Sequence, residues 1–360
     1  MPKKHISFEE MIKDAGEPLP RVTAEEAAAM ITSDEITEYD RKLITSTVAE
    51  LVHTARMFKG IRQRPKVTIF GSARTKPDHP DYITCKEFAR QLAQAGYMII
   101  TGAGPGIMAA GHEGAGPENS IGVNIALPFE QGVNEYIAQS EYLITYRYFF
   151  NRKLTFVREA DAVVICPGGF GSMDEAFEVL TLVQTGRAMP VPFVLLEHEN
   201  SDYWSHWESY IEKALLGNDT ISKEDMYLFR RFTDPAQAVD YIHNFYRRYH
   251  SLRYIGDKVI IRLNTRLPKE LLETLREEYA DFLDDFGMQE SDALPEEHDE
   301  PDLVNLPRLV LQANRKQPVG LYLLIRSLNR EVRSSSTRRQ DRNDGGLTPL
   351  PPRPNREKTG

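Results

Sequence analysis

Residues 161–186 read DAVVICPGGFGSMDEAFEVLTLVQTG, and three patterns follow one another within this stretch. The apolar run at its start predicts a buried β-strand, and the glycine-rich segment PGGFG predicts a tight loop. The apolar residues that follow recur at three- and four-residue steps, which is typical of an amphipathic helix. A buried strand that passes through a short loop into a helix is the repeating unit of an α/β fold.

The same order of strand, loop and helix recurs on both sides of this stretch. Further predicted strands lie in KVTIFG, YMIITGAGPG, SIGVNIALP, YLITYRY and PFVLLEH, and YITCKEFARQLAQAG is one of the helical segments between them. Apolar strands that alternate with helices form a parallel sheet covered on both faces. We therefore expect residues 65–250 to form a Rossmann-like, doubly wound parallel sheet, with ligands beyond the carboxyl ends of its strands.

Residues 1–64 are predicted to form an N-terminal helical extension. Apolar residues at helical spacing support this helix, namely Ile44, Val48, Leu51, Val52, Ala55 and Phe58. The simpler interpretation is that this apolar face packs on the main domain. A contact between two subunits is the alternative.

A small α+β appendage is predicted for residues 254–330. The segments DKVIIRL, LPRLVLQ and GLYLLIRSL predict strands, and Pro268 is suited to the first position of a helix. Residues 331–360 are rich in Ser, Arg, Pro and Gly without periodicity, so we expect a disordered tail.

The composition is that of a globular protein, with 41% hydrophobic and 27% charged residues among 360. A net charge of −9 argues against nucleic acid as a partner. No apolar run has the length of a signal peptide core or a membrane helix, so no membrane association is expected. Two cysteines are consistent with a reducing cytoplasm, and the nine histidines are scattered, so no metal site is predicted.

Two loops near the predicted carboxyl ends of strands are candidates for anion binding. In TGAGPGIM, the residues Gly102, Gly104 and Gly106 allow the backbone to approach an anion at the start of a helix. Gly71 and Ser72 of the segment GSAR follow the first strand and are expected to line the same cleft. A simple turn between strand and helix remains the alternative for TGAGPGIM.

The loop PGGFGSMDE allows two interpretations. Gly168, Gly169 and Gly171 can present successive N–H groups, and Ser172 adds a hydroxyl, so the loop can hold a phosphate beside the carboxylate of Glu175. In the alternative, Ser172 and Glu175 have the spacing of a capping box and only satisfy backbone groups of the helix.

Arg152 and Lys153 precede the strand that leads into this loop. Adjacent residues on a helix do not share a face, so the two cations are expected to have separate roles. An arginine near the cleft can pair with a phosphate or a carboxylate. The aromatic residues Tyr148, Phe149 and Phe150 before them are expected in the core rather than as a platform for base stacking.

Taken together, GAGPGIM, the pair RK and PGGFGSMDE resemble the LONELY GUY (LOG) family, which has also been described as possible lysine decarboxylases. The resemblance covers about residues 65–245, and the pair RK falls on Arg152 and Lys153. Plant-type members have Met-His-x before this pair, where the chain has Phe-Phe-Asn, which is similar to the longer bacterial branch. The family motif PGGxGTxxE, with serine here in place of threonine, is matched by Pro167, Gly168, Gly169, Gly171, Ser172 and Glu175.

The resemblance implies an N-glycosidase that hydrolyses nucleoside 5′-monophosphates to a free base and ribose 5-phosphate. It implies that Glu175 stabilises the positive charge that develops on the sugar, that Arg152 supports this transition state, and that Lys153 assists in binding. The glycine loops and Ser172 are then expected to hold the 5′-phosphate. No cofactor is required, and a homodimer or higher homo-oligomer is expected. The sequence leaves open whether the substrate is AMP or a cytokinin nucleotide.

Three other functions are weaker interpretations of the same residues. A non-catalytic carrier of a nucleotide or cofactor, of the molybdenum-cofactor-carrier type, needs the same loops but no turnover. A pyridoxal-phosphate decarboxylase needs a Schiff-base lysine, and Lys153 already has a role in the family motif. A dinucleotide-dependent dehydrogenase is disfavoured because the first glycine loop follows the second strand rather than the first.

Overall fold

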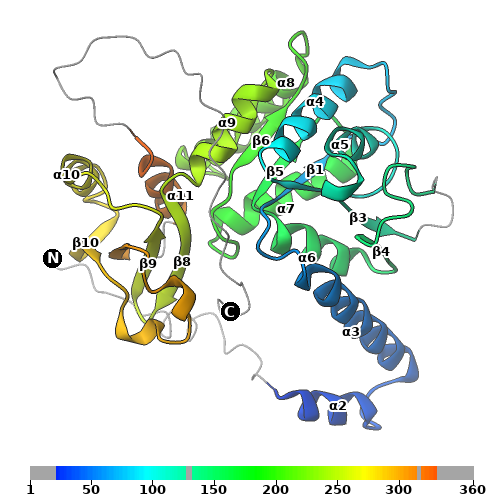
Figure 1. Cartoon of the computed structure of the whole chain (residues 1–360), viewed down its shortest axis with the longest axis horizontal. Helices are drawn as coiled ribbons and strands as arrows, with labels where there is room; N and C mark the ends of the chain where they lie inside the picture. The colour runs from blue at the N-terminus through cyan, green and yellow to red at the C-terminus, as the bar shows by residue number, and fades with distance from the viewer. Residues whose placement is uncertain (1–21, 127–131, 314–317, 331–360) are drawn as a thin grey trace.

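Seven parallel strands form the centre of the larger part of the molecule (Figure 1). The computed structural model describes residues 22–126, 132–313 and 318–330, so the tail predicted for residues 331–360 lies outside the described residues. In spatial order the strands are β4 (Leu143–Tyr146), β3 (Ser120–Ile125), β2 (Met98–Thr101), β1 (Lys66–Phe70), β5 (Ala162–Ile165), β6 (Phe193–Leu196) and β7 (Arg230–Phe232).

Helices cover both faces of this sheet, because residues along each strand alternate between two apolar layers. In β1, Val67 and Ile69 belong to one layer and Phe70 to the other. This arrangement confirms the predicted doubly wound α/β fold. The helices of this part are α4 (Pro80–Gln94), α5 (Ile107–Ala115), α6 (Phe149–Glu159), α7 (Phe170–Gln184), α8 (Tyr203–Tyr210) and α9 (Pro235–Phe245).

The position of β1 determines where a ligand can bind. Strand β1 pairs with β2 on one side and with β5 on the other, so the direction of the strand order reverses between β1 and β5. In open α/β sheets the crevice at such a reversal, beyond the carboxyl ends of the strands, is the usual ligand site. The segments GSAR, TGAGPGIM and PGGFG follow β1, β2 and β5, so all three lie at this crevice.

From residue 22 on, the N-terminal segment forms helices α2 (Ala24–Thr32) and α3 (Glu38–Lys59). Helix α3 lies where the apolar spacing predicted a helix, and it extends away from the sheet (Figure 1). Phe58 at its end is fully buried in the main core, whereas Val48 and Val52 are exposed. Only the last turns of the apolar face therefore pack on the main domain.

The C-terminal part is an antiparallel sheet of four strands in the order β10–β11–β9–β8. Its strands and helices are β8 (Tyr249–Ile255), β9 (Lys258–Leu263), α10 (Lys269–Glu278), β10 (Leu283–Ser291), β11 (Arg308–Ala313) and α11 (Pro318–Ser327). The short helical turns in the described part of the chain are η1 (Pro117–Asn119), η2 (Ile211–Leu215), η3 (Leu216–Asn218), η4 (Glu224–Tyr227), η5 (Pro295–Glu297) and η6 (Pro301–Leu303).

One prediction for this part is wrong: GLYLLIRSL does not form a strand. It lies largely in helix α11, whose buried side chains include Leu321, Leu324 and Ile325 at helical spacing. A short continuous apolar run does not distinguish a buried strand from a buried helix, which explains the error. Helix α11 packs against α7 of the larger part, and both contribute to one continuous apolar core.

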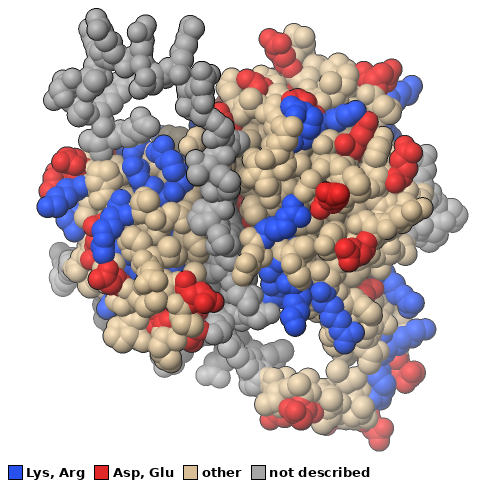
Figure 2. All heavy atoms as spheres, viewed as in Figure 1, with Lys and Arg blue, Asp and Glu red and all other residues tan. Residues whose placement is uncertain are grey.

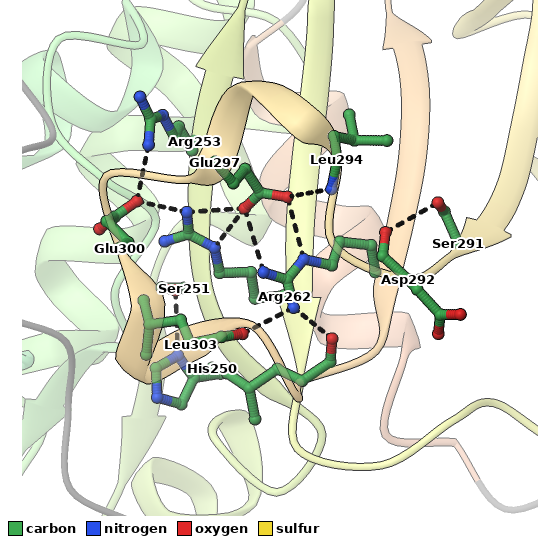
Figure 3. Close-up of polar contacts among 12 residues, drawn as sticks. His250, Ser251, Arg253, Arg262, Ser291, Asp292, Leu294, Glu297, Glu300 and Leu303 are labelled. Atoms are coloured by element: carbon green, nitrogen blue, oxygen red, sulfur yellow. Dashed lines mark hydrogen bonds and ion pairs between the residues drawn. The ribbon is translucent and has the colours of Figure 1, made fainter.

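A buried ionic network closes the loop that contains η5 and η6 over the small sheet (Figure 3). Arg262 and Arg308 are fully buried, and both donate hydrogen bonds to the carboxylate of Glu297. Glu300 accepts hydrogen bonds from Arg262 and from Arg253. Asp299 also accepts a hydrogen bond from Arg253, so three arginines face three carboxylates and their charges are compensated within the C-terminal part.

Basic and acidic side chains are interspersed on the face that Figure 2 shows. Among the helices of the described residues, none is both long and apolar enough to span a membrane.

Candidate active site

The loops after β1 and β2 are interlocked by close backbone contacts. Gly106 has φ +67°, and a Cβ atom there would lie 2.2 Å from the carbonyl oxygen of Ser72. A Cβ atom on Gly71 would lie 2.6 Å from the side chain of Ile107. The amide of Ile107 donates a 3.0 Å hydrogen bond to the carbonyl of Ser72. Glycine is therefore required at these two positions by the approach of one loop to the other.

The PGG loop after β5 joins the same group. The amide of Ser72 donates to the carbonyl of Pro167 at 3.1 Å. A Cβ atom on Gly168 would lie only 2.1 Å from the hydroxyl oxygen of Ser172, so this position is closed to larger residues. At Gly169 and Gly171, by contrast, a Cβ atom would meet nothing within 4 Å. The loop is packed on one side and open on the other.

The alternative that Ser172 and Glu175 form a capping box is wrong. Helix α7 begins at Phe170 after the N-cap residue Gly169, which makes no side-chain capping bond. Ser172 therefore lies inside the first turn, three residues beyond the position of a capping serine. Ser172 and Glu175 are three residues apart on the same side of the helix, and both are buried.

Glu175 is a buried carboxylate, with 7% of its surface exposed. Its Oε1 atom lies 3.2 Å from the ammonium group of Lys153. Among the described residues, no hydrogen-bond partner is present for its buried Oε2 atom. Burial raises the pKa of Glu175, and the nearby charge of Lys153 opposes this effect.

Lys153 contacts three carboxylates of helix α7. Its Nζ atom lies 2.9 Å from Asp174, 3.2 Å from Glu175 and 2.8 Å from Glu178. Burial lowers the pKa of Lys153, but the hydrogen bonds to Glu178 and Asp174 outweigh it and leave this pKa raised. The ammonium group is therefore directed at α7, where it compensates negative charge.

Arg152, the neighbour of Lys153, points toward the other glycine loop. Its Nε atom donates to the carbonyl of Val123 at 2.9 Å, and Nη2 donates to the carbonyl of Gly102 at 3.5 Å. The guanidinium also lies 5.2 Å from the ring centroid of Phe156. As expected of adjacent residues on a helix, Arg152 and Lys153 point in different directions. Helix α6 thereby contacts both the first glycine loop and helix α7.

Sequence reasoning did not identify Asn134 as a residue that holds the first glycine loop. Its side-chain amide donates to the carbonyls of Ala103 and Gly104, at 2.9 Å each. Ala103 has φ 64°, an unusual conformation for a residue other than glycine. Gly104 packs against Met108, whose Cε would be 2.7 Å from a Cβ atom there. An asparagine in a loop gives no sequence pattern that predicts this contact.

Tyr203 was missed for the same reason. It is the first residue of α8, and its hydroxyl donates a 2.6 Å hydrogen bond to the carbonyl of Gly168. Gly168 follows β5 and Tyr203 begins the helix that follows the neighbouring strand β6, so the two residues lie far apart in the sequence.

The prediction that Phe149 and Phe150 belong to the core is wrong. About half of each side chain is exposed, at 50% and 51%. Phe170, at the start of α7, is 96% exposed. Large apolar side chains are thus exposed next to the PGG loop and at the start of α6. An open pocket of about 520 Å³ is lined by Ser72, Arg74, Thr75, Lys76, Asp78, His79 and Pro80.

Among the residues described, no group of three or more His, Cys, Asp or Glu side chains is arranged to hold a metal ion.

Three solved structures resemble this chain: the molybdenum cofactor binding protein of the phototrophic bacterium Rippkaea orientalis, the structural-genomics target TM1055, and the molybdenum cofactor carrier protein of Chlamydomonas reinhardtii. Their identities to this chain are 18%, 21% and 16%, and their TM-scores are 0.35, 0.36 and 0.35. Each match covers 49% of this chain, and 94%, 96% and 94% of the respective structures. At these sequence identities and TM-scores, the comparison gives no information on what this chain binds.

No curated protein matches this chain. Residues 105–242 match the family described as "Possible lysine decarboxylase". The matched segment contains Arg152, Lys153 and the whole PGG loop, which are residues on which the resemblance to the LONELY GUY family was based. This match over residues 105–242 confirms the resemblance to the LONELY GUY family that the sequence motifs indicated.

Proposed function

We propose that this chain is a nucleoside 5′-monophosphate phosphoribohydrolase. It would cleave the N-glycosidic bond of AMP or of a cytokinin riboside monophosphate and release the free base and ribose 5-phosphate. The observation that carries this proposal is the buried carboxylate of Glu175, whose Oε2 atom has no partner among the described residues. It lies one turn beyond the open PGG loop.

The 5′-phosphate has a suitable site at the start of α7. Within the described part of the chain, the N–H groups of Gly169, Phe170 and Gly171 have no hydrogen-bond acceptor. Unpaired amides at a helix N-terminus attract anions through hydrogen bonds and through the helix dipole. A phosphate bound there would place the ribose toward Glu175, since Gly171 and Glu175 share one side of the helix.

Glu175 would act at C1′ of the ribose. Departure of the base leaves positive charge on the sugar, and a fixed carboxylate stabilises that charge. A water molecule then adds its hydroxyl group to C1′ as Glu175 accepts its proton. Glu175 releases this proton to solvent, and the departed base nitrogen takes up one proton from solvent, so the enzyme returns to its starting state. Arg152, held between Val123 and Gly102, would orient the substrate and stabilise the negative charge of the leaving base.

Lys153 would serve the carboxylate rather than the phosphate. Its ammonium group contacts Glu175 directly, and a nearby positive charge favours the ionised form of a carboxylate. Lys153 would therefore keep Glu175 charged despite its burial.

The test is the release of free base from AMP, from isopentenyl-adenosine monophosphate and from adenosine, followed by chromatography. We expect release from the monophosphates and little from adenosine, because the phosphate binding energy is used at C1′. Glu175→Gln should lower the rate by about 100-fold or more. Asp174→Asn, on the same helix and also in contact with Lys153, is the matched control and should retain most of the activity.

The ratio of the rates with AMP and the cytokinin nucleotide would identify the preferred base. If the protein binds AMP but releases no base from any substrate, a non-catalytic carrier of a nucleotide-like ligand is correct instead. In that case Glu175→Gln would leave the affinity for AMP nearly unchanged.

We further propose that the chain works as a homo-oligomer in the cytoplasm. Exposed Phe149, Phe150 and Phe170 next to the candidate site support a subunit contact there, because large exposed apolar side chains mark interfaces. Both cysteines are free and buried, which is consistent with a reducing compartment. Light scattering should give at least twice the mass of one chain, and Phe150→Glu should reduce it; a monomeric wild type would contradict the proposal.

A further inference from the structure

Tyr203 reaches the PGG loop from a different part of the sheet. It follows β6, the strand that pairs with β5, and its hydroxyl donates to the carbonyl of Gly168 at 2.6 Å. This is the one side-chain hydrogen bond to the backbone of residues 167–171 within the described part of the chain. The contact therefore acts on the segment that would receive the phosphate.

The geometry of the peptide bond gives this contact a specific consequence. A trans peptide is planar, so the carbonyl of Gly168 and the N–H of Gly169 point in opposite directions. When Tyr203 holds the carbonyl, it also directs the N–H of Gly169 away from itself. The preceding peptide is held in the same way, because the carbonyl of Pro167 accepts from the amide of Ser72. Both peptide planes around Gly168 are thus fixed.

Tyr203 is itself held in a fixed position. Its amide donates to Ser201 at 3.3 Å, and its ring lies edge-on against Trp204, with 4.9 Å between the ring centroids. Trp204 is fully buried, and its amide donates to Glu197 at 3.1 Å. These contacts fix the position of the Tyr203 hydroxyl relative to the sheet.

We propose that Tyr203 is a positioning residue that pre-organises the PGG loop for a phosphate monoester. Two successive glycines rotate easily about their backbone bonds, so the loop alone would lose entropy when it binds an anion. The hydrogen bond from Tyr203 already restricts the loop in the free protein. Less conformational entropy is therefore lost when the anion binds, and binding is stronger. The proposal rests on the proposed function of the same loop as the phosphate site.

The test is Tyr203→Phe, which removes the hydroxyl and keeps the ring. We expect the KM for AMP to rise by about three- to tenfold, the range for one lost hydrogen bond, while kcat changes by less than about twofold. The kcat/KM for adenosine, which has no phosphate, should stay unchanged. Tyr210→Phe, at the exposed end of the same helix, is the matched control and should behave as the wild type.

Binding of ribose 5-phosphate, measured by calorimetry, gives a readout that does not depend on turnover. Its Kd should rise by the same factor in Tyr203→Phe, with an unchanged melting temperature. An unchanged KM and Kd, or equal losses with AMP and adenosine, would overturn the role of Tyr203. If the wild type binds ribose 5-phosphate but does not hydrolyse AMP, the proposed enzymatic function is wrong. The role of Tyr203 is then decided by the Kd for ribose 5-phosphate in Tyr203→Phe. A wild type that does neither would overturn both.

Discussion

Burial of Glu175 opposes the charged form that the proposed chemistry requires. Because burial raises its pKa in the folded state, the contribution of this group to stability is present at low pH and is lost as the pH rises through that pKa. At neutral pH the carboxylate therefore lowers the stability of the fold. Glu175→Gln should melt at the wild-type temperature or slightly above it, as calorimetry can measure. A clear decrease in melting temperature would show that Glu175 has a structural role instead.

Lys153 is the residue that counteracts this effect, and Lys153→Met tests it. Without the ammonium group, burial and the charge of Glu178 are opposed only by the smaller effect of Arg152, so the pKa of Glu175 should rise further. The acid limb of the pH–rate profile should move to higher pH by about 1 unit or more. Activity should recover as the pH is raised. A loss that is equal at every pH would mean that Lys153 contacts the substrate directly.

At the scale of elements, the site depends on glycines with different functions. Gly106→Ala should destabilise the protein by about 2 kcal/mol or more, because its positive φ and the carbonyl of Ser72 exclude a side chain. Denaturant unfolding would measure this difference. Gly171→Ala is the matched comparison: it has open space around it and lies in the first turn of α7. Its stability should stay within about 0.5 kcal/mol of wild type, while its affinity for AMP falls.

The ionic network of the small sheet should depend on one carboxylate, Glu297. Burial alone would raise the pKa of Glu297, but hydrogen bonds from Arg308, from the amide of Leu294 and from Arg262 outweigh it and lower that pKa. Its contribution to stability is thus present above the ordinary carboxyl pKa and is lost as the pH falls through the lowered value.

Glu297→Gln should therefore destabilise the protein by about 3 kcal/mol at neutral pH, because two buried guanidinium groups lose their shared charge partner. The difference from wild type should shrink toward low pH. Thermal melting between neutral and acidic pH would measure it. The exposed neighbour Glu296, changed to Gln, should have almost no effect, and an equal effect of both changes would contradict the role of the network.

At the scale of the whole molecule, the C-terminal part (residues 249–330) supports helix α7, which carries Glu175. Helix α11 packs against α7, and Leu324 of α11 shares one apolar core with Val179 and Val183 of α7. Pro318 lies next to Gly186, where a Cβ atom would be 3.2 Å away. A shared core makes the two parts unfold together.

Leu324→Ala tests this coupling. This substitution should lower the free energy of unfolding by about 2–5 kcal/mol, because Leu324 is fully buried. Both tryptophans of the chain, Trp204 and Trp207, belong to α8 in the α/β domain, so fluorescence reports on that domain alone. The fluorescence and circular dichroism transitions should shift together toward lower denaturant concentration. A fluorescence transition that does not move would show that the two parts unfold independently.

Much of the site was predictable from local patterns, and some of it was not. The glycine loops, Ser172, Glu175 and the pair Arg152–Lys153 follow from short motifs next to apolar runs. The partners of Lys153 and the contacts of Tyr203 and Asn134 did not follow, since each joins segments that are distant in the sequence. The exposed Phe149 and Phe150 were misjudged because aromatic composition alone does not report which side of a helix is covered.

The sequence by itself determined the order of strands, loops and helices and the residue types at their ends, because these depend on spacing and backbone freedom within a few residues. Only the tertiary structure decided that β1 lies between β2 and β5, and so which loops share one crevice. It also decided that Ser172 lies inside α7 rather than at its cap, and that GLYLLIRSL is helical. Such outcomes depend on packing between distant segments, whose free energy no local pattern contains.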